Sequence, residues 1–240
     1  MEHSIITPEN LSSFAFHTGD QCVGKIKGIV LDFHGLGFTP MMEETPEPAK
    51  QYGAKGGIYV FPYYGPWSWM NTIAVKTVDQ IVAAIRNKYN LSDSVPVIAT
   101  GGSMGGLSAL VYTRYAEITP AACAAVCPVC DLPYHYTERA DLPRTIYHAF
   151  FHYDCDFQTA MKSASPVHLA REMPDIPYYI LHGNQDSMVN KEKHSDRFVA
   201  AMLESNHRNM TYKTAVGMEH CMLSEEDRKS YDDFIIRFLK

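Results

Sequence analysis

The sequence predicts one α/β domain, built on a mostly parallel sheet with helices on both of its faces. Apolar runs of strand length alternate with helical patterns along nearly the whole chain, as in successive strand–helix–strand units. The strand-like runs are continuously apolar, which is typical of strands that helices cover on both sides. A chain of 240 residues can bury the core of one such domain, so we expect residues 1–240 to form a single unit.

Six apolar runs are predicted to be strands, because each is short, apolar and followed by turn residues: 27–35, 57–63, 95–101, 121–129, 177–183 and 210–217. Four segments have helical character: 75–89, 106–116, 194–206 and 224–239. In the first helix, Val75, Val78 and Ile81 fall on one face. The last helix opens like a capping box, with Ser224 followed by Asp227 in place of the usual Glu.

One stretch, residues 131–165, breaks this alternation and is rich in aromatic and histidine residues. An insertion of this length at a strand end is usually a lid or cap. Its aromatic side chains would form a costly exposed patch unless they covered something. We predict that the insertion is a short cap over the active-site cavity, where Phe150 and Phe151 contact the substrate. The alternative is an interface with a second copy of the chain, which would make the protein a homo-oligomer.

Composition and charge exclude several classes of function. A net charge of −6 without a run of five basic residues argues against a nucleic-acid-binding protein. No apolar stretch reaches the length of a transmembrane helix, so we expect no membrane partner. The N-terminus lacks the basic start and apolar core of a secretory signal, and a domain of this size does not need disulfides. We therefore expect the protein to be cytoplasmic, with its six cysteines reduced.

We also expect neither a metal ion nor an organic cofactor. Cys127 and Cys130 form a C-x-x-C, but no second pair accompanies them and the context is not thioredoxin-like. The histidines of the insertion, together with Asp154, fit no standard metal-ligand spacing.

The segment "GGSMGG", residues 101–106, indicates a strained turn between a strand and a helix. A strand that turns abruptly into a helix leaves no room for neighbouring side chains, which Gly101 and Gly105 lack. Ser103 then projects above the carboxyl edge of the sheet, as in the nucleophile elbow Gly-x-Ser-x-Gly. The N–H groups and positive dipole end of the helix point at this serine, where they would stabilise a developing oxyanion.

A serine hydroxyl needs a base, and the base needs an acid that orients it. His220 follows the last predicted strand, and Asp186 follows the strand before it, so both should reach the same edge of the sheet as Ser103. Asp131, one strand earlier, is the rival acid. A loop after an early strand, "HGLG" at residues 34–37, has glycines that let its backbone approach a ligand.

With "GGSMGG", "FHGLG" and "LHGNQD" in the order Ser, Asp, His, the sequence resembles the α/β-hydrolase superfamily over nearly its whole length. Within the superfamily it resembles the esterase and prolyl-oligopeptidase-type branch. The resemblance implies an α/β-hydrolase fold with Ser103 as nucleophile, Asp186 as acid and His220 as base. It also implies an oxyanion hole formed by the N–H groups of Leu36 and Met104, with Gly35 or Gly37 as alternatives to Leu36. The segment between Cys130 and Pro166 departs from the caps of the family.

The sequence thus predicts a serine esterase of the carboxylesterase type, with a catalytic triad and an oxyanion hole. Its substrates would be small-molecule esters with small to medium acyl or aryl groups, because an alkoxide leaves more easily than an amide nitrogen. Two alternatives remain, a small serine peptidase of the prolyl-oligopeptidase type and a non-catalytic binding protein that retains the fold. The residues expected to line the substrate pocket are Gly35, Tyr64, Trp67, Trp69, Phe150 and Phe151.

Overall fold

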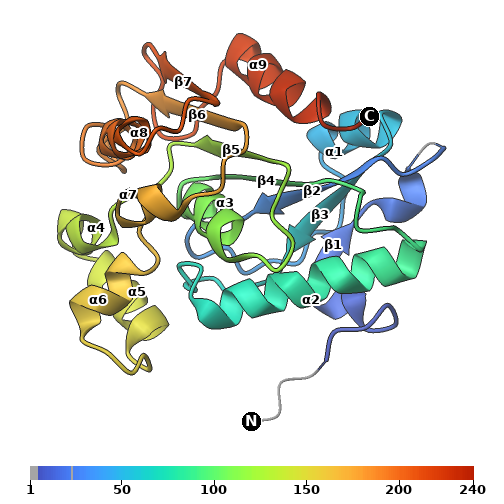
Figure 1. Cartoon of the computed structure of the whole chain (residues 1–240), viewed down its shortest axis with the longest axis horizontal. Coiled ribbons are helices and arrows are strands. Elements are labelled where there is room, and N and C mark those ends of the chain that lie inside the picture. Colours follow the sequence, from blue (N-terminus) through green and yellow to red (C-terminus); the bar gives the residue numbers. More distant parts are fainter. Residues whose placement is uncertain (1–4, 23) are drawn as a thin grey trace.

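A seven-stranded sheet lies between two layers of helices in the computed structural model, which describes residues 5–22 and 24–240 (Figure 1). The strands are β1 (Ala15–His17), β2 (Gly28–Phe33), β3 (Gly57–Pro62), β4 (Val97–Gly102), β5 (Ala122–Val126), β6 (Tyr178–Gly183) and β7 (Met210–Ala215). Their order across the sheet is β1-β3-β2-β4-β5-β6-β7. All neighbouring pairs are parallel except β1 with β3. The predicted fold class is therefore confirmed.

Helices cover both faces of the sheet, and each face has its own buried core. The helices of the two layers are α1 (Glu47–Ala54), α2 (Thr72–Tyr89), α3 (Met104–Tyr115), α8 (Ser195–Glu204) and α9 (Glu225–Ile236). The side chains of α1 and α9 pack in one core, and those of α2, α3 and α8 pack in the other. Figure 1 shows α1 and α9 on the upper side of the sheet and α2 on the lower side.

All six strands and all four helices predicted from the sequence are present, with small shifts at their ends. The sequence analysis missed β1 and α1, since the first has only three residues and the second has few apolar side chains. The predicted N-cap of α9 is confirmed, because Ser224 Oγ accepts the N–H of Asp227 at 3.1 Å. The Asp227 carboxylate also accepts the Ser224 hydroxyl at 2.7 Å and forms an ion pair with Lys213.

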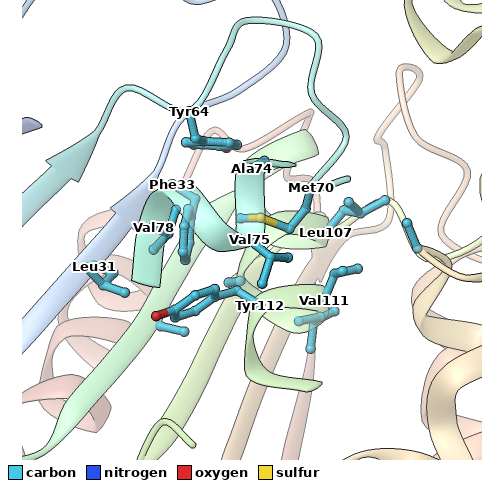
Figure 2. Close-up of a cluster of buried hydrophobic side chains, with 14 of the residues drawn as sticks. Leu31, Phe33, Tyr64, Met70, Ala74, Val75, Val78, Leu107, Val111 and Tyr112 are labelled. Carbon is cyan, nitrogen blue, oxygen red and sulfur yellow. The ribbon is translucent and has the colours of Figure 1, made fainter. Parts of the chain in front are cut away.

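The core beneath the nucleophile turn is densely aromatic and aliphatic. Figure 2 shows Phe33 of β2 among side chains of α2 and α3. The ring of Phe33 lies 5.4 Å from that of Tyr64 and 5.6 Å from that of Tyr112, centroid to centroid. This packing fixes α3, which begins next to Ser103, against the central strands of the sheet.

The insertion at residues 131–165 folds into three short helices beyond β5. They are α4 (Leu132–Glu138), α5 (Leu142–Phe150) and α6 (Phe157–Lys162), followed by α7 (Pro166–Leu169). Aromatic side chains join these helices, since the ring of Phe157 lies 5.4 Å from Tyr136 and 5.5 Å from Tyr147. Many of the aromatic residues in the insertion are therefore used to hold its own helices together.

None of the helices in the described part of the chain combines the length and apolar character needed to cross a membrane. All six cysteines lie at described positions and are free thiols. Three of them are buried, two are partly buried, and Cys155 is exposed.

We predict that Gly105→Ala destabilises the fold strongly, because a Cβ at this position would lie 1.9 Å from the carbonyl oxygen of Phe33. Overpacking against side chains costs about 1–3 kcal/mol, and here the obstacle is backbone that must shift. The matched control is Gly53→Ala in α1, where the nearest atom is 3.7 Å away. This control should be neutral or gain about 0.5–1 kcal/mol. Urea unfolding of both variants tests the prediction, and equal stabilities would contradict it.

Candidate active site

Ser103 sits at the tip of the turn from β4 to α3 in a conformation that L-residues rarely adopt, with φ 61° and ψ −124°. Such strain persists only where the surrounding structure enforces it. The close approach of strand and helix does so here, because a Cβ on Gly101 would lie 2.5 Å from the carbonyl oxygen of Gly105. The N–H of Ser103 donates to Val126 O at 2.9 Å, which ties the turn to β5. Ser103 lines a cavity of about 1030 Å³.

His220 lines the same cavity and is hydrogen-bonded to Asp186. Its Nδ1 donates to Asp186 Oδ2 at 2.7 Å, so its Nε2 is left to act as a base or acceptor. Asp186 lies in the loop after β6, and His220 lies in the loop after β7. The structure therefore brings together the three residues that the sequence analysis selected, from three different loops.

Asp186 is surrounded by donors, and its side chain is fully buried. Its Oδ1 accepts the N–H groups of Met188 and Val189, each at 2.9 Å. Its Oδ2 accepts His220 and is also 3.2 Å from His182 Nε2. The sequence analysis did not connect His182 with Asp186, although their spacing of four residues was a usable signal. The structure shows that His182 helps to hold the carboxylate.

The pKa values of this pair move in opposite directions. Burial alone would raise the pKa of Asp186, but the hydrogen bonds from His182, His220 and the backbone hold it well below its usual value. Burial lowers the pKa of His220, but the hydrogen bond to Asp186 and the contact with Cys127 outweigh burial and raise this pKa to about 9. The buried thiol of Cys127 itself stays protonated, since its contact with Cys221 and its burial raise its pKa. We therefore attribute the high pKa of His220 chiefly to Asp186.

The rival acid, Asp131, is placed elsewhere and has other partners. Its Oδ1 accepts the N–H of Tyr134 at 3.1 Å and so caps α4. Its other oxygen forms an ion pair with Arg197. Asp131 is not among the residues that line the cavity.

The predicted oxyanion loop borders the cavity beside Ser103. Gly35 and Leu36 line the cavity, while the side chain of Met104 is buried in the core and leaves only its backbone to act. Within residues 5–22 and 24–240, the N–H groups of Leu36 and Met104 have no hydrogen-bond acceptor. Both are therefore available to bind a negatively charged oxygen.

Tyr64 supports this loop from behind and does not line the cavity. Its hydroxyl donates to His34 O at 2.9 Å, and its ring stacks on that of His34 with centroids 4.2 Å apart. The side chain of His34 bonds in turn to the carbonyl oxygen of Gly35 at 2.9 Å. The expectation that Tyr64 contacts substrate is wrong, because a buried side chain with these contacts fixes the loop.

Two further substrate-pocket predictions are also wrong. Phe150 is buried in the core and Phe151 is exposed, and neither lines the cavity. Trp67 and Trp69 do line it, as expected, together with Phe38 and Phe61. The error over Phe150 and Phe151 arose because the insertion uses its aromatic residues for its own packing.

The insertion nonetheless forms one wall of the cavity, and this wall is polar. The insertion residues that line the cavity are His135, Arg139, Ala140, Asp141, Arg144 and Thr145. His135 is held by Glu138, whose Oε2 lies 2.6 Å from its Nδ1. Arg139 is paired with Asp141 at 2.6 Å. The cavity therefore has an aromatic side and a charged side.

Three groups of side chains in the described part of the chain have donor atoms close enough to bind a metal ion. They are Cys127, His220 and Cys221; Cys127, His182 and Asp186; and His135, Glu138 and His194. In the second group, both nitrogens of His182 are engaged, by Ser195 Oγ at 2.6 Å and Val189 O at 3.1 Å. In the third, His194 accepts backbone N–H groups at Nδ1 and contacts Glu138 at Nε2. In the first group, Nε2 of His220 contacts the sulfur of Cys221 at 3.9 Å, so its contact lies within the group itself.

A family profile described as the prolyl oligopeptidase family matches residues 68–240. This match covers more than half of the chain and includes Ser103, Asp186 and His220. A comparison with curated proteins found no match.

Solved structures with a similar fold include peptidases and an esterase. The acylaminoacyl peptidase of Pyrococcus horikoshii has a TM-score of 0.71 and 10% identity, over 90% of this chain and 37% of its own. A puromycin-hydrolyzing peptidase of Mycobacterium tuberculosis has a TM-score of 0.67 and 18% identity. The match covers 90% of this chain and 33% of the peptidase. The esterase PE8 has a TM-score of 0.60 and 16% identity. The match covers 90% of this chain and 94% of the esterase. The chain thus spans about a third of the length of the two peptidases, and these identities show the fold alone.

We predict that kcat/KM rises with pH along a limb near pH 9, because only neutral His220 can accept a proton and its pKa is raised to about 9. Asp186→Asn should move this limb down toward the ordinary histidine value of about 6.5. The same change should lower kcat roughly 10⁴-fold, as for an acid that orients a catalytic histidine. Asp131→Asn is the control and should change neither quantity. A limb that does not move in the Asp186→Asn enzyme would show that another group titrates.

Proposed function

The chain belongs to the prolyl oligopeptidase family of serine hydrolases, and from this premise we propose that Ser103, His220 and Asp186 carry out acyl transfer in it. The observation that supports this proposal best is the 2.7 Å hydrogen bond from His220 to Asp186 at a cavity that also holds the strained Ser103. A buried, ionised carboxylate behind a histidine is the arrangement that activates a serine hydroxyl.

In the proposed reaction, Ser103 Oγ attacks the carbonyl carbon of the substrate, and its proton passes to His220 Nε2. The carbonyl oxygen becomes an oxyanion held by the N–H groups of Leu36 and Met104. The leaving group then takes the proton from His220 as the carbonyl bond re-forms, which leaves an acyl group on Ser103. A water molecule repeats the sequence, releases the acid and restores the serine.

The electrostatics of the pair favour the first proton transfer. When His220 accepts the proton it becomes a cation next to the ionised Asp186, in a buried site where their attraction is strong. The same carboxylate accepts the hydrogen bond from Nδ1, so the lone pair of the imidazole is on Nε2, where it can accept the proton of Ser103.

Carboxylic esters with small to medium acyl or aryl groups are the proposed substrates. The aromatic side of the cavity, formed by Phe38, Phe61, Trp67 and Trp69, fits an apolar acyl or aryl group. An alkoxide also leaves more readily than an amide nitrogen, so esters make the smaller demand on proton transfer from His220.

Peptide or aminoacyl amides are the second candidate. Two observations favour them: the family match, and the charged wall that Arg139, Asp141 and Arg144 contribute to the cavity. Such a wall can pair with the charged end of a short peptide. The cleavage of esters and amides of one acyl group therefore has to be compared directly.

We predict that acetyl to butyryl p-nitrophenyl esters are hydrolysed faster than the palmitoyl ester, and that esters are hydrolysed faster than aminoacyl p-nitroanilides. Trp67→Ala should change the chain-length preference, because Trp67 lines the cavity. The matched control, Phe151→Ala, should not, since Phe151 is exposed outside it. Higher kcat/KM on the anilides would favour the peptidase, and turnover that survives Ser103→Ala would contradict both candidates.

A further inference from the structure

Two cysteines lie close to the imidazole of His220, the proposed catalytic base. Cys127 follows the end of β5, and Cys221 follows His220 in the loop after β7. The sulfurs of both cysteines and one ring nitrogen of His220 lie within 4.8 Å of one another. The sulfur of Cys221 is 3.9 Å from His220 Nε2, and the N–H of Cys221 points at the sulfur of Cys127 at 3.5 Å.

The imidazole of His220 turns a nitrogen toward the sulfurs of this group, because Nε2 contacts Cys221 Sγ at 3.9 Å while Nδ1 is held by Asp186. The hydrogen bond from Nδ1 to Asp186 fixes the tautomer of His220 and leaves the lone pair on Nε2. A metal-bound histidine typically donates its other nitrogen to a carboxylate in this manner. Asp186 is therefore placed as the outer-shell partner of a histidine ligand.

The backbone holds both cysteines in strained positions. Cys127 has φ 43° and Cys221 has φ 56°, in the left-handed region that cysteine seldom adopts. Strain of this kind is unfavourable for folding and clusters at functional sites. These two strained residues place their sulfurs within 4.8 Å of a ring nitrogen of His220.

We propose that Cys127, Cys221 and His220 form a binding site for a zinc ion, with the fourth coordination position open to the cavity. Two thiolates and one imidazole are an established zinc ligand set. With bonds of about 2.3 Å to sulfur and 2.0–2.1 Å to nitrogen, these ligand atoms would lie roughly 3.5 Å apart. The 3.9 Å between Cys221 Sγ and His220 Nε2 is close to that geometry. Binding is a ligand exchange without redox change, in which the two thiols release their protons as Zn²⁺ takes their place.

The ion and the proposed reaction compete for one lone pair. A zinc ion on His220 Nε2 blocks the atom that would accept the proton of Ser103, so the bound form cannot carry out acyl transfer. Zinc thus acts as a reversible inhibitor, and this part of the inference rests on the proposed function. Metal binding itself does not, because the three ligands are present whether or not the protein hydrolyses esters.

The binding site is tested by titrating the reduced, metal-free protein with Co²⁺, which reports tetrahedral thiolate ligation by its absorption bands. We expect one equivalent of Co²⁺ to give these bands and Zn²⁺ to remove them. Cys221→Ser should abolish the bands, and Cys127→Ser should do so if its fold is retained by circular dichroism. Cys155→Ser, which removes an exposed cysteine away from the site, is the matched control. Bands that survive in folded Cys221→Ser, or that are absent from the wild type, would overturn the site.

The competition is tested with the p-nitrophenyl ester assay, with each variant compared with its own zinc-free rate. We expect Zn²⁺ to inhibit the wild type and Cys155→Ser equally, and a chelator to restore both. Cys221→Ser should need at least tenfold more Zn²⁺ for the same inhibition. Equal sensitivity of Cys221→Ser would overturn the inhibitory role. A protein that shows the cobalt bands but hydrolyses no ester or amide would contradict the proposed function while leaving the metal site intact.

Discussion

The close approach of β4 and α3 is the constraint on which the rest of this structure depends. Gly101 and Gly105 let the strand and the helix meet at distances that no Cβ would permit, and Ser103 is forced into a strained conformation between them. The packing of Phe33 against α3 holds the helix in place. The strain thereby presents one hydroxyl at the carboxyl edge of a parallel sheet, where the loops after β6 and β7 can reach it.

The second organising feature is the buried carboxylate of Asp186. Four donors surround it, and two of them are histidines, so it remains ionised in a place where burial alone would favour protonation. Its charge raises the pKa of His220 and fixes which nitrogen faces the cavity. This one interaction underlies both proposals, in which Nε2 accepts a proton from Ser103 or binds a zinc ion held by two cysteines.

Much of the fold followed from the sequence, because buried parallel strands and amphipathic helices have strong periodic signals. The placement of Ser103, Asp186 and His220 at one edge of the sheet was also predictable, since loops that follow parallel strands meet there. The positions of Tyr64, Phe150 and Phe151 relative to the cavity were not predictable. The sequence alone does not show whether an aromatic side chain between strands lines a ligand pocket or packs against its own scaffold. The contacts of Cys127 with Cys221 join residues far apart in the chain, and no local pattern reports them.

The central claim is that the strained serine is the nucleophile of this protein. Labelling of the folded protein with a fluorophosphonate, followed by peptide mass spectrometry, tests that claim most directly. A single adduct on Ser103, formed more slowly when Asp186 is replaced by asparagine, is the result that the account predicts. An adduct on another serine, or labelling that persists in a Ser103→Ala variant, would contradict it.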